Sequence, residues 1–418
     1  MAKVADTGSP EAPRTTNSQS MTEIGQAAQS SEPVSGLTHN FYRYPARFSP
    51  TFARAVIRAF TQRGDTVFDP FMGGGTTLVE AAALGRKAIG TDINPLSLFV
   101  TKAKTIPLSE MDIARVQNWA VRLIPALNLR SPAITGGKWA EGGYQRNIGS
   151  RSTWPIRKTL GLALGHVSLL RTDRQRRFAR CALLRTGQWA LDCRATVPSA
   201  KQFREQFLEY LGEMIEGTRE YARALNDGTS SSPEETNKTP LCVGRSAIGI
   251  ETDPALATSF PPALILTSPP YPGVHVLYHR WQVRGRRETP APFWIVGSPD
   301  GNGSSYYTFG DRKCLGLESY YDHLRRAYHS LARIASTNTV LVQLVAFTDP
   351  SWQLPRYLGI LQEAGFEEMR FDSIANSEDG RIWREVPHRK WHAALNGKAD
   401  SAKEVVLIHR AVQVRTTA

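Results

Sequence analysis

The chain has 418 residues and a formal net charge of +13 at pH 7, a length that suits one large domain with insertions or two domains. Its basic character favours a polyanionic partner, either nucleic acid or an anionic membrane surface, with a simple gain in solubility as the alternative. It contains no apolar run near the roughly 18 residues of a membrane span and no signal-peptide pattern, which predicts a cytoplasmic protein.

The cysteines have neither CxxC spacing nor histidine partners at metal-ligand intervals. They predict ordinary reduced thiols, with no disulfide framework and no metal site. They are Cys181, Cys193, Cys242 and Cys314.

Residues 1–36 are rich in Ser, Thr, Ala, Gln and Pro and contain scarcely any large apolar side chain. Such a segment cannot bury enough surface to offset the entropy lost on ordering, so we predict a disordered tail. The tail holds more acidic than basic side chains, so the positive charge belongs to the rest of the chain.

Strand and helix patterns alternate from residue 66 onward, with a strand at 66–71, a helix at 76–85, a strand at 87–93 and a helix at 95–104. The rhythm resumes at 263–268 (strand), 318–335 (helix), 339–347 (strand), 352–366 (helix), 367–375 (strand) and 403–411 (strand). This order predicts a doubly wound α/β fold with a mostly parallel sheet. Because two strands in succession end the series, we expect the last one to run antiparallel.

A long segment without this rhythm separates the two series. We therefore divide the chain into an α/β domain, 37–105 and 238–418, and an inserted, mainly helical region at 106–237. Within the insertion, residues 138–194 carry 12 basic and 3 acidic side chains, which predicts a DNA-recognition role. Phosphate contacts are expected from Arg174, Arg177 and Arg180, with Arg284, Arg286 and Arg287 as a second footprint; the alternative for the helix is a solvated face.

The stretch "FDPFMGGGTT" follows a strand and opens a helix, where a doubly wound sheet binds nucleotide-like cofactors. A GxGxxG fingerprint would need glycine at Leu78, and a phosphate-binding P-loop would need lysine at Thr76. Asp69 would repel a pyrophosphate but suits a cationic aminoacyl group. These differences disfavour both a dinucleotide-binding loop and a P-loop. They also disfavour the alternative of a nicotinamide oxidoreductase.

Asp92 ends the next strand, where it is placed to accept hydrogen bonds from two ribose hydroxyls. A helix-capping aspartate is the alternative. A nucleoside with a charged amino-acid tail and no phosphates matches both features, so we expect S-adenosylmethionine as the cofactor.

The strand at 263–268 ends on "SPPY", where two prolines fix the backbone and remove two amide donors. The Ser268 hydroxyl and the Pro269 carbonyl are acceptors suited to the hydrogens of a nucleobase amino group, and Tyr271 offers a stacking face. A stiff loop with a packed tyrosine is the alternative.

These motifs together resemble the amino-group DNA methyltransferases. "DPFMGGGTTLVEAAALGRKAIGTDINP" is similar to their cofactor motif, "TSPPY" to their catalytic motif, and "FYRYPARFSPTFARAVIRAF" to the segment that closes over the cofactor. The resemblance covers about residues 38–105 and 238–411 and implies a seven-stranded methyltransferase sheet with an antiparallel last strand.

The resemblance also implies roles for individual residues. The expected cofactor-binding residues are Asp69, Phe71, Gly73, Gly75, Asp92, Ile93 and Ser246, and the expected catalytic residues are Ser268, Pro269, Pro270 and Tyr271. Arg245 and Ser246 stand where the family commonly has an acidic residue that faces the adenine.

The leading serine of SPPY is typical of the cytosine-N4 enzymes. We therefore expect a site-specific methyltransferase that moves a methyl group from S-adenosylmethionine to the exocyclic N4 of cytosine in double-stranded DNA, after flipping the base out of the helix. A cognate restriction endonuclease is a candidate partner. The alternatives are adenine-N6 of DNA, a base in RNA, and a nucleic-acid binder that kept the fold without the activity.

Overall fold

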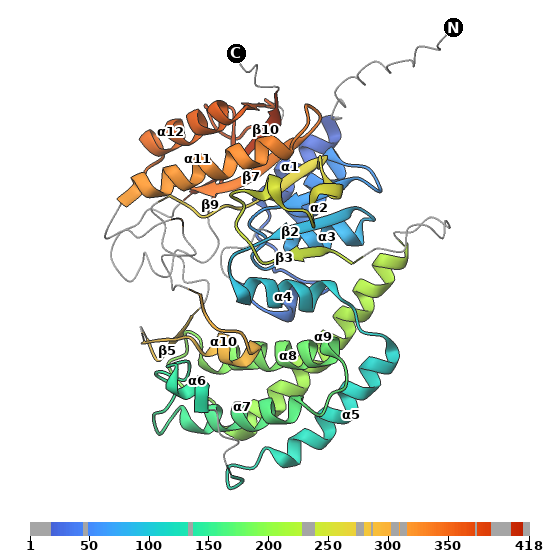
Figure 1. Ribbon diagram of the computed structural model, residues 1–418, viewed down its shortest axis with the longest axis vertical. Coiled ribbons are helices and arrows are strands. Elements are labelled where there is room, and N and C mark those ends of the chain that lie inside the picture. Colours follow the sequence, from blue (N-terminus) through green and yellow to red (C-terminus); the bar gives the residue numbers. More distant parts are fainter. Residues whose placement is uncertain are drawn as a thin grey trace.

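The computed structural model describes residues 18–44, 49–132, 137–227, 239–272, 280–285, 287–301, 309, 316–372, 374–385 and 403–412. Within these ranges, eight strands form one sheet, in the order β3-β2-β1-β4-β7-β10-β8, and β9 pairs with β10 (Figure 1). They are β1 (Thr66–Asp69), β2 (Lys87–Thr91), β3 (Leu241–Val243), β4 (Leu264–Thr267), β7 (Val340–Ala346), β8 (Phe366–Glu368), β9 (Ile382–Glu385) and β10 (Lys403–Ala411).

The central strands run parallel from β3 to β7, and β10 runs antiparallel to both β7 and β8. The predicted mostly parallel sheet with an antiparallel last strand is confirmed. The strand expected at 367–375 is shorter, because β8 ends at Glu368 and the pairing with β10 is continued by β9.

Two apolar cores cover the two faces of the sheet. Successive strand residues alternate between them, since Val67 packs with one core and Phe68 with the other. The first core holds α1 (Ser18–Gln29), α2 (Pro50–Phe60) and α3 (Thr76–Ala83), and the second holds α11 (Gly316–Ile334) and α12 (Pro350–Ala364). Helices on both faces make the sheet doubly wound, as expected.

The prediction of a disordered tail over residues 1–36 is wrong for α1. This helix buries Met21, Ile24, Ala27 and Ala28, and it packs against α2 and β9. Few apolar side chains are enough here, because they lie on one helical face and meet a core that other elements already form. Residues 1–17 lie outside the described ranges.

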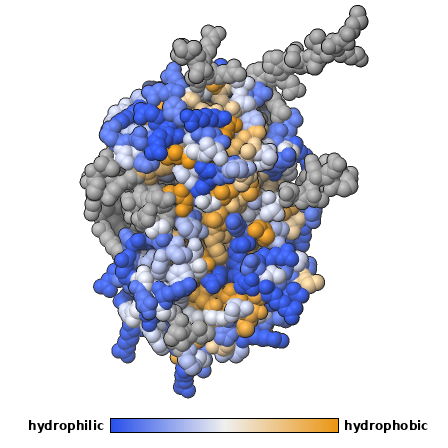
Figure 2. Space-filling model, in the orientation of Figure 1, coloured by the Kyte–Doolittle hydropathy of each residue, from blue (hydrophilic) through white to orange (hydrophobic). Residues whose placement is uncertain are grey.

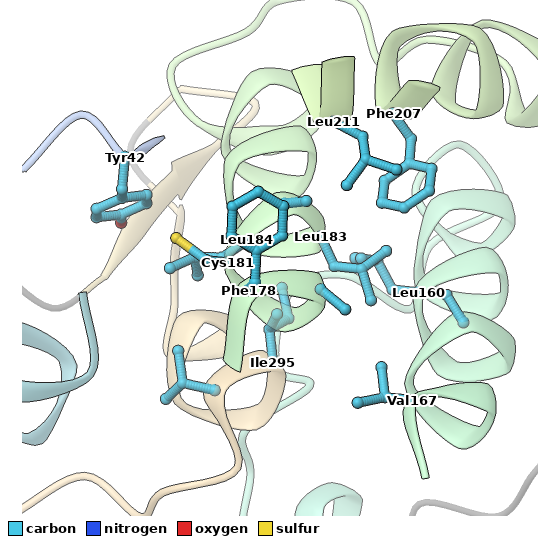
Figure 3. Packing of buried hydrophobic residues seen from close by; sticks show 14 of the residues in the cluster. Tyr42, Leu160, Val167, Phe178, Cys181, Leu183, Leu184, Phe207, Leu211 and Ile295 are labelled. Atoms are coloured by element: carbon cyan, nitrogen blue, oxygen red, sulfur yellow. The ribbon is translucent and has the colours of Figure 1, made fainter. Parts of the chain in front are cut away.

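The insertion is helical, as predicted, and forms the lower half of Figure 1. Its helices are α5 (Glu110–Ala126), α6 (Gly137–Glu141), α7 (Trp154–Val167), α8 (Asp173–Leu191) and α9 (Ala200–Asp227). The N-terminus of α8 is fixed by a capping box between Thr172 and Gln175. Figure 3 shows part of the core of this bundle, to which α8 contributes Phe178, Leu183 and Leu184, α7 contributes Leu160 and Val167, and α9 contributes Phe207 and Leu211.

The bundle also recruits residues that follow the SPPY loop. The hairpin of β5 (Trp281–Val283) and β6 (Arg287–Thr289) and the helix α10 (Ala291–Val296) pack into the same core, next to α8. The sequence division assigned these residues to the α/β domain, yet their apolar side chains are buried in the helical half. The helix α4 (Pro95–Thr105) lies between the sheet and the bundle in Figure 1 and also contributes Leu96 and Val100 to the bundle core.

The face of the molecule seen in Figure 2 is hydrophilic over most of its upper and lower parts, with hydrophobic residues gathered along its middle. Among the described helices, none combines the length and apolarity that a membrane span requires.

Candidate active site

The glycine loop connects β1 to α3 and depends on its glycines. Gly73 has φ of 45° and Gly75 has φ of 73°, a region that disfavours residues with a Cβ. Gly74 is required for another reason, because a Cβ there would lie 2.8 Å from the Cβ of Tyr44. The loop is thus a tight turn of bare backbone, as expected from the sequence.

Asp69 lies at the end of β1 and joins the glycine loop to the SPPY loop. Its carboxylate accepts hydrogen bonds from the hydroxyls of Thr77 and Thr267, at 2.7 Å each, and from the backbone N–H of Phe71 at 3.1 Å. Since Thr267 ends β4, this carboxylate ties the carboxyl ends of two neighbouring strands together. Burial raises the pKa of Asp69 to about 6, against the opposing effect of these hydrogen bonds.

Asp92 follows β2 and faces the glycine loop. One carboxylate oxygen accepts from the N–H of Gly73 at 2.9 Å and from the Ser97 hydroxyl at 2.8 Å, and the other accepts from the N–H of Asn94 at 2.8 Å. Burial raises the pKa of Asp92 above the usual aspartate range. The N-cap of α4 is Asn94, whose side chain accepts from the N–H of Leu96, so Asp92 is not the capping residue.

The segment before α2 lies over the glycine loop, where the resemblance places a cofactor-closing segment. The hydroxyl of Tyr44 accepts from the Asn94 amide at 3.1 Å, and the hydroxyl of Tyr42 accepts from the Trp281 indole at 3.0 Å. Gln188 of α8 hydrogen-bonds the backbone N–H and C=O of Arg43. This segment therefore connects the glycine loop to the helical bundle. Residues 45–48, also part of the predicted closing segment, lie outside the described ranges.

A buried ionic cluster anchors the same segment, and no sequence pattern predicted it. Glu80 of α3 is fully buried, with His39 Nε2 at 2.8 Å and Arg54 Nε at 2.8 Å. Burial opposes the charge of Glu80, but these hydrogen bonds lower its pKa below the usual glutamate value. The three residues are far apart in sequence, so no periodic pattern identifies them.

The SPPY loop follows β4, next to the glycine loop. The Ser268 hydroxyl donates to the carbonyl of Leu344 at 3.0 Å and lies 2.9 Å from the Tyr271 hydroxyl. The carbonyl of Pro270 accepts from the hydroxyl of Tyr320 at 2.7 Å. Tyr271 is 7% exposed, so its ring is largely covered in this state.

Two polar residues at this loop were missed by the sequence interpretation. The Tyr271 hydroxyl donates to Oε1 of Glu404 at 2.9 Å, and Oε2 of Glu404 accepts from Arg384 Nε at 2.7 Å. Both lie in strands at the far end of the chain, β10 and β9. In the sequence, only the presence of an acidic residue within the apolar strand 403–411 pointed to a buried polar contact of Glu404.

The remaining predicted cofactor residues lie around the same edge of the sheet. Phe71 packs edge to face against Phe309, with ring centroids 5.4 Å apart. Ile93 follows Asp92 and is partly accessible, and Ser246 follows β3, the neighbour of β2. The structure therefore brings all the predicted cofactor and catalytic residues to the carboxyl ends of β3, β2, β1 and β4.

The guanidinium of Arg245 is engaged within the protein. It forms an ion pair with Asp253 at 2.6 Å and donates to the carbonyl of Gly249 at 2.7 Å. It thereby closes the loop that follows β3.

The predicted arginine stripe of α8 makes contacts within the protein. Arg174 pairs with Asp112 at 2.8 Å, and Arg180 donates to the Ile295 carbonyl of α10 at 2.6 Å. Arg177 is half-buried, and burial lowers the pKa of its guanidinium. The structure thus gives Arg180 an internal role, whereas the phosphate contacts of the other two remain predictions.

The second predicted footprint lies at the tip of the β5–β6 hairpin. Arg284 is exposed, with φ of 48°, and donates to the Ser152 hydroxyl of the bundle at 3.0 Å. Arg287 is exposed at the start of β6, and Arg286 lies outside the described residues.

The residues that the structure describes include no group of three or more His, Cys, Asp or Glu side chains placed to hold a metal ion. Cys181 and Cys242 are buried free thiols, Cys193 is exposed, and Cys314 lies outside the described part of the chain.

Comparison with known proteins matches residues 11–98 to the family N6_N4_Mtase, described as DNA methylase. Type II methyltransferase M.MvaI of Kocuria varians is 44% identical over 82 residues, which are 19% of this chain and 18% of that protein. Type II methyltransferase M.BsoBI of Geobacillus stearothermophilus is 40% identical over 81 residues, 18% of this chain and 16% of that protein. The matched segment thus spans less than one fifth of either relative.

Among solved structures, an rRNA methyltransferase, aviRa from Streptomyces viridochromogenes, covers 89% of each chain at 12% identity and a TM-score of 0.34. The likeness is distant, and the architecture of this chain follows from its own strand order.

Proposed function

We propose that this chain transfers a methyl group from S-adenosylmethionine to the N4 amino group of cytosine in double-stranded DNA, and the match of residues 11–98 to the DNA methylase family supports this proposal. One observation carries the proposal. Asp69 holds the glycine loop and the SPPY loop side by side at the carboxyl edge of the sheet, through Phe71 and Thr267. A cofactor over the first loop and a base in the second would meet there.

The residues at the glycine loop fit S-adenosylmethionine. Gly73 is partly accessible, and so is Asp92 beside it, whose carboxylate accepts from the N–H of Gly73. In this proposal Asp92 holds the ribose, Asp69 offsets the charge of the aminoacyl group from within the loop, and Phe71 covers the methionine end. Ile93 and Ser246 flank the adenine. When bound, this cofactor supplies an electrophilic methyl group.

The catalytic loop makes the target nitrogen a better nucleophile. The lone pair of an exocyclic amino group is delocalised into the base, so the nitrogen must be held with its hydrogens directed at acceptors. Ser268 Oγ and the Pro269 carbonyl serve as those acceptors, with Pro270 and Tyr271 shaping the pocket around the base. The nitrogen then forms the new N–C bond as the S–C bond breaks, and one amino proton leaves to water. Because the nitrogen itself attacks, the reaction needs no covalent link between enzyme and base.

The target base has to leave the duplex before it reaches this loop. A stacked and paired cytosine cannot present its lone pair to an in-line methyl donor, so we infer base flipping at a cost of a few kcal/mol. Stacking against Tyr271 offsets part of this cost, which requires the largely covered ring to become accessible.

The decisive test is nucleoside mass spectrometry of mixed-sequence double-stranded DNA incubated with the protein and S-adenosylmethionine. N4-methylcytosine in the digest is the expected product. N6-methyladenine would keep the enzyme class and replace the target base. Cofactor binding without methylated DNA or RNA would favour the alternative of a binder that kept the fold.

We infer that DNA lies across the helical region 106–237 and the hairpin that packs on it. The exposed arginines Arg284 and Arg287 are the phosphate contacts we favour, together with Arg174 and Arg177. Replacing Arg284 and Arg287 by alanine should weaken binding to all sequences alike and flatten the salt dependence by about one unit per lost contact. Arg58→Ala, on the exposed side of α2, is the matched control for loss of charge. An unchanged salt slope would place the footprint elsewhere.

Two of the relatives are named Type II methyltransferases, and we propose a cognate restriction endonuclease as a partner of this chain. The composition supports a cytoplasmic location for this function.

A further inference from the structure

A buried chain of hydrogen bonds runs from the catalytic loop to the far end of the sheet. The contacts are Ser268 Oγ to the Tyr271 hydroxyl at 2.9 Å, this hydroxyl to Glu404 Oε1 at 2.9 Å, and Arg384 to Glu404 Oε2 at 2.6 Å. Tyr271 is 7% exposed, and the side chains of Arg384 and Glu404 are 9% and 5% exposed. Tyr271, Glu404 and Arg384 are therefore largely shielded from water, whereas Ser268 at the end of the chain is partly accessible.

The positions of the hydroxyl protons of Ser268 and Tyr271 follow from the groups at the two ends of the chain. Glu404 carries a carboxylate, which accepts hydrogen bonds and donates none, so the Tyr271 proton points to Glu404. Ser268 then gives its own proton either to the Leu344 carbonyl, at 3.0 Å, or to the Tyr271 oxygen. In both arrangements the Ser268 oxygen receives no proton from Tyr271.

We propose that Glu404 is a positioning residue that keeps Ser268 an acceptor toward the target amino group, by drawing the Tyr271 proton away from it. This inference rests on the proposed function, because Ser268 needs a free lone pair only if the amino group of a target base donates a hydrogen bond to it. Without Glu404, the Tyr271 hydroxyl would turn to Ser268 and occupy a lone pair that the amino group needs.

Arg384 fixes the orientation of Glu404. Its Nε and a terminal nitrogen both reach Oε2, which leaves Oε1 for Tyr271. Arg384 also lies 3.5 Å from the carbonyl of Ala28, near the end of α1. The helix found in place of the expected tail thus contacts the remote end of the chain that leads to Ser268.

Glu404→Gln tests the inference, because it keeps the shape of the side chain and reverses one contact. Arg384 only donates, so the new amide would turn its oxygen to Arg384 and its NH₂ group to Tyr271. Tyr271 must then accept from the amide and donate to Ser268. We expect kcat for DNA methylation to fall about tenfold or more, with the KM values for DNA and cofactor within about threefold of wild type.

A second set of variants removes the Tyr271 hydroxyl, and with it the proton that Glu404→Gln would redirect to Ser268. In a Tyr271→Phe background there is no phenolic proton to redirect, so adding Glu404→Gln should lower kcat by less than about threefold. A role limited to stability would instead give the same loss in both backgrounds. Glu368→Gln is the matched control, since Glu368 forms a comparable pair with Arg381 at 2.7 Å on β8 and does not contact the SPPY loop.

The outcomes separate the two proposals. A wild-type protein that methylates no nucleic acid overturns the proposed function. If the wild type methylates DNA and Glu404→Gln leaves kcat unchanged, the positioning role alone is overturned. The same holds if Glu404→Gln lowers kcat by the same factor with and without Tyr271→Phe. If Glu404→Gln does not fold, Glu404→Asp replaces it, because the shorter carboxylate can keep Arg384 but withdraws from Tyr271. We then expect that Glu404→Asp lowers kcat less in the Tyr271→Phe background than in the wild-type background. An equal loss of kcat in both backgrounds refutes the inference.

Discussion

Replacing Asp69 by asparagine should change how the stability of this protein depends on pH. The carboxyl group is 2% exposed and receives hydrogen bonds from Thr77 and Thr267. Burial nevertheless raises its pKa from 3.8 to about 6, because desolvation outweighs those contacts. An asparagine has nearly the same shape as the protonated acid, and the two threonine hydroxyls can rotate to serve its amide.

The sign follows from the direction of the shift. A carboxyl group with a higher pKa in the folded state binds its proton more tightly there, so its contribution to stability is fully present below pH 3.8 and is lost as the pH rises through about 6. A shift of about two units corresponds to about 3 kcal/mol of unfolding free energy. The asparagine variant does not undergo this loss, so its stability relative to wild type should rise by about 2 kcal/mol between pH 4.5 and about 7.5, the part of the loss that falls in this window.

Urea unfolding of wild type and Asp69→Asn at several pH values measures this difference. Glu141→Gln, which removes an exposed carboxylate in α6, controls for the general effect of net charge. A difference between Asp69→Asn and wild type that stays constant from pH 4.5 to about 7.5 would mean that the carboxyl group titrates normally, and the burial argument would be wrong.

Three further changes test the site. Asp92→Asn should raise the dissociation constant for S-adenosylmethionine about tenfold or more, since hydrogen bonds to a charged carboxylate contribute about 1.5–3 kcal/mol each; calorimetry with an unchanged constant would refute the ribose assignment. Gly74→Ala should lower the unfolding free energy by about 1–3 kcal/mol, because its Cβ would lie 2.8 Å from Tyr44. An unchanged unfolding free energy would show that the segment around Tyr44 can move away without cost. Arg180→Gln should lower the melting temperature by removing the bond to the Ile295 carbonyl while the salt slope of DNA binding stays the same, and a smaller slope would restore it as a phosphate contact.

Local pattern was enough to predict the α/β fold and the two loops. A strand buried on both faces produces a short apolar run, and a tight turn at positive φ requires glycine at Gly73 and Gly75. Two prolines likewise mark the end of β4, whatever lies around them. These signals depend on neighbours in the sequence, and parallel strands bring their carboxyl ends to one edge. The predicted cofactor and catalytic residues therefore meet there in the structure.

Elements whose order depends on distant partners were predicted poorly. The α1 helix has a weak apolar face, which becomes stable by packing against α2 and β9. Residues 281–296 follow the SPPY loop in sequence, yet their apolar side chains pack with α8 in the helical half. Composition alone does not say which core a short apolar segment joins.

The sequence by itself determined the class of fold and the two motifs at its edge, because both arise from backbone chemistry within a few residues. Only the tertiary structure decided which polar groups surround those motifs. Tyr271 and Glu404 are 133 residues apart and His39 and Glu80 are 41 apart, and each pair is held by a hydrogen bond inside the protein. Such contacts leave no periodicity in the chain, because a single buried hydrogen bond constrains two positions and nothing between them.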